Sequence, residues 1–188
     1  MQLRYLLLSV VAGLVVGCLG SRGAQVSYDS DENLTRYEVG NYTVSTRSGS
    51  NFATSKSINM RAVGQCEGAN CSPDVVQLIF TASGNQQLSL SGLDGKIVAD
   101  EMKFDWSTAD ASQSSGIRAN DQMIRASGKF AVVDVPVGTL KKIATASSVE
   151  GSIGGQSLDL GSSVQAGFQD LLRKMSPKSS NSETSGAP

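Results

Sequence analysis

The sequence predicts a mainly β domain, an antiparallel β-sandwich or partly open barrel, followed by a C-terminal helix–hairpin–helix. Three observations predict this class. Aromatic residues make up only 5% of the chain, whereas glycine, serine and β-branched residues are abundant, which favours short strands joined by turns. Several segments alternate apolar and polar residues, as strands with one buried face do. After Pro136 the apolar spacing changes to that of a helix.

The first predicted strands lie in the N-terminal half. Tyr37–Thr46 has an imperfect alternation around Gly40, which predicts a β-bulge. Ile58–Gln65 and Val75–Ala82 alternate regularly and are predicted to pair as a hairpin. A further strand is expected at Gln86–Ser91.

The middle of the chain is predicted to hold two long strands and a loop. Leu93-Asp94-Gly95 is predicted to be a turn, because Asp-Gly favours turn conformations. Lys96–Trp106 is predicted as one strand, with Phe104 and Trp106 on its buried face and Lys103 and Asp105 on its exposed face. Ser107–Asn120 is polar and is expected to be an exposed loop, and Met123–Val135 to be one long strand.

The last forty residues of the domain carry helical patterns around a hairpin. Pro136 suits a first helical position, and apolar residues then recur at helical spacing: Val137, Leu140, Ile143 and Ala144. Val149–Ile153 and Gln156–Leu160 flank Gly154-Gly155, which predicts a two-residue hairpin turn. A final helix is predicted from one apolar stripe: Val164, Phe168, Leu171, Leu172 and Met175. We expect a capping box of Ser162 and Gln165 at its start and Pro177 after its end.

The first residues have the order of an export signal. Arg4 is the only charged side chain before the apolar run Leu6–Val16, and a small residue, Gly17, precedes Cys18. The ending Val15-Val16-Gly17-Cys18 resembles the lipobox of bacterial lipoproteins. That resemblance covers only the signal segment, and it implies that Cys18 is diacylated and becomes the first residue of the mature protein.

Other interpretations of this start stay open. A retained transmembrane anchor needs about 20 apolar residues, and this run is shorter and contains Ser9 and Gly13. A soluble secreted protein requires a small-x-small cleavage site, for which Cys18-Leu19-Gly20 is a poorer candidate. A cytosolic core helix would not begin at residue 5 and end in a Gly-Ser-Arg-Gly segment.

Lipoprotein sorting rules indicate the membrane. In Gram-negative lipoproteins an aspartate after the cysteine favours the inner membrane, and this chain has Leu19 there. By that resemblance we expect an outer-membrane anchor with the domain facing the periplasm. The expected organisation is a signal peptide (1–17), a lipidated tether (18–35), one β-rich domain (36–175, with the helix–hairpin–helix at 136–175) and a disordered tail (176–188).

The remaining cysteines, Cys66 and Cys71, form an even pair. In an oxidising compartment the expected state is a disulfide, here across the mouth of the hairpin with Gly68 and Asn70 in the turn. Two alternatives stay open. A redox-active pair normally has two residues between its cysteines rather than four, and a zinc site needs two further ligands.

Composition excludes several function classes. The chain has no histidine, which rules out a histidine-based triad and imidazole metal ligands. Without residues 1–17 the chain loses only Arg4, leaving 15 Lys and Arg against 17 Asp and Glu, a net charge of −2. This near-balance gives no electrostatic reason to expect nucleic acid as a partner. No cofactor is indicated.

The possible catalytic or ligand groups are weak candidates. Asp29-Ser30-Asp31-Glu32-Asn33 starts like an EF-hand loop but has Leu34 and Gly40 where glycine and glutamate are required. A cell-wall hydrolase could use either carboxylates of the acidic region from Asp94 to Asp110 or a serine paired with Lys141 or Lys142. Phe104 and Trp106 are candidates for lining a ligand site.

The sequence therefore favours a non-enzymatic lipoprotein of the outer membrane, which binds an envelope protein or cell-wall component or supports envelope assembly. The alternative is a carrier of lipid, glycan or peptide, and a cell-wall hydrolase is the third hypothesis.

Overall fold

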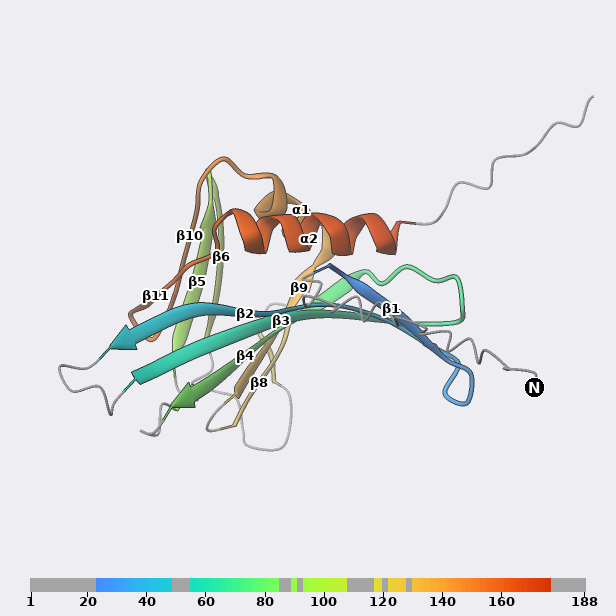
Figure 1. Ribbon diagram of the computed structural model, residues 1–188, viewed down its shortest axis with the longest axis horizontal. Coiled ribbons are helices and arrows are strands. Elements are labelled where there is room, and N and C mark those ends of the chain that lie inside the picture. The colour runs from blue at the N-terminus through green and yellow to red at the C-terminus, as the bar shows by residue number, and fades with distance from the viewer. Residues whose placement is uncertain are drawn as a thin grey trace, which may run out of the picture.

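The computed structural model describes residues 23–48, 55–84, 89–90, 93–107, 117–119, 122–127 and 130–176. Within these ranges the chain is mainly β, with two antiparallel sheets and two C-terminal helices, as the sequence predicts. Figure 1 shows both helices over one face of the larger sheet, with the smaller sheet beside them. The described strands form two separate sheets, so the sandwich describes the fold better than the barrel.

In the described part of the chain, the larger sheet has seven strands in the order β1-β2-β3-β4-β9-β8-β7. Their bounds are β1 (Gln25–Asp29), β2 (Leu34–Ser48), β3 (Ser55–Glu67), β4 (Val75–Gly84), β7 (Ile117–Ala119), β8 (Gln122–Ser127) and β9 (Phe130–Pro136). Strands β1 to β4 follow one another as a meander, and β9 pairs with the far side of β4. β1 is therefore one edge of the sheet.

The smaller sheet has four described strands in the order β11-β10-β5-β6. Their bounds are β5 (Asp94–Ala99), β6 (Met102–Ser107), β10 (Val149–Ile153) and β11 (Gln156–Leu158). Two hydrogen bonds at β11 join it to β2: the Asp159 backbone amide, just after β11, donates to the Val44 carbonyl at 2.5 Å, and Gln156 Nε2 donates to Ser45 Oγ at 2.7 Å. The predicted hairpin is present, with φ of +56° at Gly154 and +74° at Gly155.

The helices are α1 (Val137–Thr145) and α2 (Ser162–Met175). Side chains of α2 fix the two helices together, because they satisfy carbonyls at the end of α1. Gln165 Nε2 donates to the Ala146 carbonyl at 2.8 Å, and Gln169 Nε2 donates to the Ala144 carbonyl at 2.7 Å. The predicted capping box is thus wrong: Gly161 is the N-cap, no side chain of the described residues caps the helix, and Gln165 instead bonds to carbonyls at the end of α1.

The core lies between the inner face of the larger sheet, the helices and the smaller sheet. Apolar residues at alternate positions of β3 and β4 face inward, which is the pattern that predicted both strands. The fully buried large side chains include Phe80, Phe168, Ile58, Met60, Leu78, Leu140, Ile143 and Leu171. On the opposite face of the sheet, Thr81 and Phe130 are exposed.

The predicted bulge in β2 is confirmed. The register between β2 and β3 shifts between Gly40 and Tyr42 and again between Thr43 and Ser45. Gly40 has a φ of +121°, and a Cβ there would lie 2.9 Å from the Cα of Arg61, so only glycine fits. The extra residue lets Val39 and Tyr42 both face the core.

Three predictions in the middle of the chain are wrong in their boundaries. Lys96–Trp106 is not one strand but the hairpin of β5 and β6, which turns at Asp100 and Glu101. Asp94 and Gly95, predicted as a turn, begin β5. Met123–Val135 is likewise the hairpin of β8 and β9.

Two loop predictions and one strand prediction have mixed outcomes. The Ser107–Asn120 loop contains β7 at Ile117–Ala119, and most of its other residues lie outside the described part. The Gln86–Ser91 strand also lies mostly outside it, although Leu90 is fully buried.

The tether predicted at 18–35 is wrong from residue 25 onward, because Gln25–Asp29 forms β1 and pairs with β2.

Candidate functional site

The disulfide between Cys66 and Cys71 closes the loop that joins β3 to β4, as the sequence predicts. The two Cα atoms are 5.8 Å apart. Gly68, inside the loop, has a φ of +93°, a left-handed conformation that glycine adopts readily. The loop is therefore a fixed structure at one end of the larger sheet.

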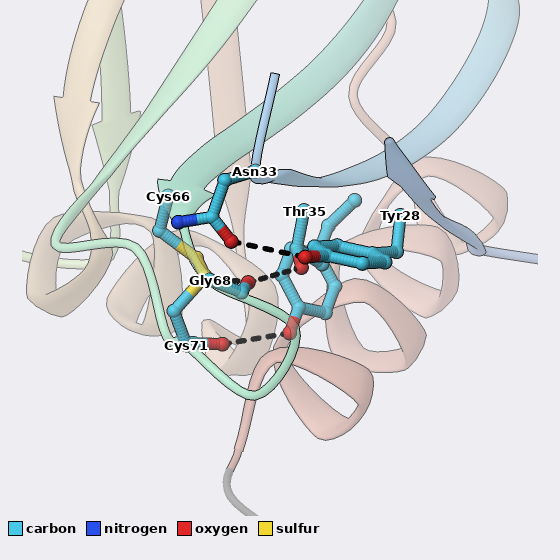
Figure 2. Close-up of a disulfide and its surroundings, with 7 residues drawn as sticks. Tyr28, Asn33, Thr35, Cys66, Gly68 and Cys71 are labelled. Atoms are coloured by element: carbon cyan, nitrogen blue, oxygen red, sulfur yellow. Dashed lines mark hydrogen bonds between the residues drawn. A yellow bond between two sulfur atoms is a disulfide. The ribbon is translucent and has the colours of Figure 1, made fainter. Parts of the chain in front are cut away.

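Three hydrogen bonds hold the start of β2 against this loop, and Figure 2 shows the two that the Gly68 and Cys71 carbonyls accept. The Gly68 amide donates to the Asn33 carbonyl at 2.7 Å, and Thr35 Oγ1 donates to the Gly68 carbonyl at 2.5 Å. The Tyr37 hydroxyl donates to the Cys71 carbonyl at 2.7 Å. Thr35 is only 1% exposed, so its hydroxyl needs this partner.

Helix α2 packs on the same loop from the other side. An added Cβ at Gly64 would lie 2.9 Å from Pro73 Cγ and 3.4 Å from Met175 Sδ. Because Gly64 has no side chain, Pro73 of the disulfide loop and Met175 in the last turn of α2 can both pack closely against it. We call residues 24–37, 64–73 and 169–176, which gather here, the disulfide end.

The N-terminal part of the described chain is fastened to this end. The Ala24 amide donates to Asp170 Oδ2 at 2.7 Å, and Ala24 is buried. Arg173, one turn further along α2, forms an ion pair with the other oxygen of Asp170. The Arg173 hydrogen bond and then the Ala24 amide hold the pKa of the Asp170 carboxyl below its ordinary value of 3.8.

A groove of about 370 Å³ opens between α1, α2 and the disulfide loop. Its lining combines cationic, apolar and uncharged polar side chains: Lys141, Arg173, Val137, Leu172, Met175, Ser72, Thr145, Gln169 and Ser176. Arg173 thus faces both the groove and Asp170. The two cations beside apolar carbon suit an anionic group attached to an apolar body. We call this groove the α1–α2 groove.

Phe104 and Trp106, the candidates for lining a ligand site, lie in the core. They are 6% and 5% exposed, and the Trp106 ring stacks on Phe80 with centroids 5.9 Å apart. Trp106 Nε1 is buried and has no hydrogen-bond partner in the described part of the chain. Their burial makes both residues packing groups of the two-sheet core.

The carboxylates proposed for hydrolysis are spread over exposed positions. Asp94, Asp100, Glu101 and Asp105 are all exposed, and Asp110 lies outside the described residues. Asp100 has a structural role, because its oxygens accept the amides of Ser147 at 3.1 Å and Ser148 at 2.9 Å. The described carboxylates therefore form no paired site in a deep pocket.

The remaining candidates are the EF-hand-like calcium loop, other metal sites and the membrane anchor. The EF-hand-like segment forms the β1–β2 turn, in which Asp29 Oδ1 accepts the amides of Asp31 and Glu32. Within the described ranges, no group of three or more metal-binding side chains gathers. None of the described helices is long and apolar enough to cross a membrane. Cys18, the signal segment and the tail 177–188 lie outside the described residues.

Comparison with known protein families, with characterised proteins and with solved structures finds no match to this chain. The site must therefore be interpreted from its own geometry. Sequence reasoning located the disulfide but missed the link from Ala24 to Asp170 and the α1–α2 groove. The spacing of Asp170 and Arg173, three residues apart on a helix, was a visible signal of their ion pair, whereas no local pattern marks the groove.

Proposed function

We propose that this protein is a lipid-anchored component of the outer membrane whose β-rich domain faces the periplasm and acts as a non-enzymatic binding or assembly module. The observation that carries the proposal is the lipobox-type sequence ending at Cys18. Six residue steps separate Cys18 from Ala24, which is bound to Asp170. Six steps of extended chain span at most about 20 Å, so a lipid on Cys18 would keep the disulfide end close to the membrane.

The binding role is supported by the α1–α2 groove. It lies beside the disulfide end, and Arg173 connects the two through its ion pair with Asp170. Lys141 and Arg173 provide positive charge, and Leu172 and Met175 provide apolar surface. This combination favours an anionic partner with an apolar portion.

The anchor is tested by intact mass and membrane partitioning of the full chain in a bacterial host, compared with Cys18→Ser. The proposal predicts a mature mass that starts at Cys18 and includes acyl chains, and the loss of both acylation and membrane association in the variant. The matched control is Cys66→Ser with Cys71→Ser, which removes two other cysteines and should leave acylation intact. An unmodified, soluble wild-type protein would contradict the proposal.

A second candidate is a carrier of lipid, glycan or peptide. The volume of the α1–α2 groove, about 370 Å³, favours it, because ligand pockets commonly measure about 300–1,000 Å³. Native mass spectrometry of protein purified from envelopes should then show a bound molecule that is lost in Leu172→Asn. Protein that carries no additional mass after gentle purification would count against a carrier.

A further inference from the structure

Strand β1 is an exposed edge. Among the described strands it pairs only with β2, and all five residues Gln25–Asp29 are exposed. Val26 and Tyr28 are 48% and 47% exposed, although they are large and apolar. They lie opposite Tyr37 and Thr35, so they extend the inner face of the sheet beyond the core.

The described residues of this edge include no lysine, proline or β-bulge. A lysine, a proline or a β-bulge commonly prevents an edge strand from pairing with another strand. The sequence of β1 is Gln-Val-Ser-Tyr-Asp, and its pairing with β2 is regular over all five residues. Its outer backbone groups and two exposed apolar side chains are thus suited to a further strand.

We propose that β1 pairs antiparallel with β1 of a second copy of this chain, about a two-fold axis through Ser27. The proposal goes beyond the proposed function, and rests on it only in that the lipid anchor concentrates the copies in one membrane. The two-fold axis of such a pair is perpendicular to the sheet, so each residue points to the same face in both copies. Directly opposite residues also share a face, so they must be an even number of positions apart in the sequence. The axis must therefore pass through a residue and not between two, and an axis through Ser27 pairs all five residues of the strand.

The side chains fit this register. Val26 of each copy lies opposite Tyr28 of the other, and aromatic with β-branched pairs are favourable across antiparallel strands. Asp29 lies opposite Gln25, so no like charges face each other. Centring on Val26 would instead place Tyr28 opposite Ala24, which is already buried against α2.

Charge complementarity extends the contact at both ends. Beyond Asp29 the chain turns through Asp31 and Glu32, which are exposed. In the proposed register this acidic turn continues past Gln25 of the other copy, toward its Ala24 and the last turn of α2. That turn carries Arg173 and Lys174, both exposed, and so offers positive charge to the acidic turn.

The arrangement also suits two anchored copies. A two-fold axis perpendicular to the sheet places both Ala24 residues on the same side of the paired sheets, about 20 Å apart for six residue steps along a strand. Both lipids can then enter one membrane. A five-residue edge buries too little area for a tight dimer in solution, but confinement to a membrane raises the effective concentration.

The test is cysteine cross-linking of the full chain, both lipidated in vesicles and as soluble Cys18→Ser over a series of protein concentrations. Ser27→Cys should form a disulfide dimer with an added mild oxidant, because opposite Cα atoms in the proposed pair lie about 4.5–5.5 Å apart. Gln25→Cys is the matched control. Its two thiols would be offset by four residues, about 14 Å along the strand, and should not cross-link.

Peptide mapping should locate the new link between the cysteines introduced at position 27 of the two copies and leave Cys66–Cys71 intact. Circular dichroism checks that each variant folds. No dimer from Ser27→Cys, in vesicles or in solution, would overturn the proposal, and so would equal cross-linking of Gln25→Cys or a link to a different protein. Absence of acylation together with a cross-linked Ser27→Cys dimer in concentrated solution would refute the anchor while supporting the pairing.

Discussion

The two-sheet core and the disulfide end are built from different interactions. In the core, apolar side chains of both sheets and both helices pack together, and the Phe80–Trp106 stack joins the sheets. At the disulfide end, a covalent link, hydroxyl-to-carbonyl hydrogen bonds and the Asp170–Arg173 ion pair hold short segments in place. This difference predicts that the core provides most of the stability, whereas in the proposed function the disulfide end positions groups for contact with a membrane or partner.

The largest effect is expected for Phe80→Ala. Phe80 is fully buried, so the variant loses apolar burial and leaves a cavity, which costs about 3–5 kcal/mol of unfolding free energy. Phe130→Ala is the matched control, because Phe130 is 43% exposed on the other face of the sheet. Urea unfolding followed by circular dichroism measures both. Equal losses in the two variants would show that the core does not dominate stability.

The next effect tests the close approach of α2 to β2. A Cβ at Gly167 would collide with the Tyr42 ring, so we expect Gly167→Ala to lose about 1–3 kcal/mol. Gly138→Ala, in α1, meets nothing within 4 Å and should stabilise the protein by up to about 1 kcal/mol, because alanine favours helix. Thermal unfolding distinguishes them, and a stable Gly167→Ala would refute this packing.

Removing the disulfide should have a moderate effect. On the chain-entropy model, a loop this short contributes about 2 kcal/mol, which Cys66→Ser with Cys71→Ser should lose. We expect faster amide hydrogen exchange at Gly68 and little change at Leu78 under conditions where the variant stays folded. Equal increases at both amides would mean that the disulfide supports the core as well as the loop.

The smallest effect concerns Asp170. Its pKa is lowered in the folded protein by Arg173 and the Ala24 amide, so its stabilising contribution is present above the ordinary pKa of 3.8 and is lost as the pH falls below it. We expect Asp170→Asn to lose about 1 kcal/mol or less and to weaken this acid dependence. Unfolding measured from pH 7 to pH 3 provides the test. An unchanged pH dependence in the variant would contradict the assignment.

Alternation predicted the strands wherever one face is buried, but it missed their ends. In the β5–β6 hairpin, Ile97 and Ala99 are buried at odd positions, whereas Phe104 and Trp106 are buried at even positions. The buried positions change from odd-numbered to even-numbered because the chain turns at Asp100 and Glu101. The break was therefore visible in the sequence, and following it would have predicted two strands instead of one.

Strand β1 was missed although its sequence, Gln-Val-Ser-Tyr-Asp, alternates polar and apolar residues. The pattern spans only five residues beside a polar stretch, and all five are exposed, so no buried face reinforces it. The groove and the Ala24–Asp170 contact join residues up to 146 positions apart, and such contacts depend on the tertiary fold. The disulfide was predictable because its two cysteines lie close together at one hairpin loop and the export-type start of the sequence predicts an oxidising compartment.

The central claim is that recognition occurs at the α1–α2 groove beside the disulfide end. The most direct measurement places a photoreactive amino acid at Thr145, which lines the groove, or at Thr81, which is exposed on the opposite face of the larger sheet, in living bacteria. We predict discrete covalent adducts with an envelope component from position 145 and none from position 81. Adducts from position 81 alone would contradict the claim and place recognition on the open sheet face.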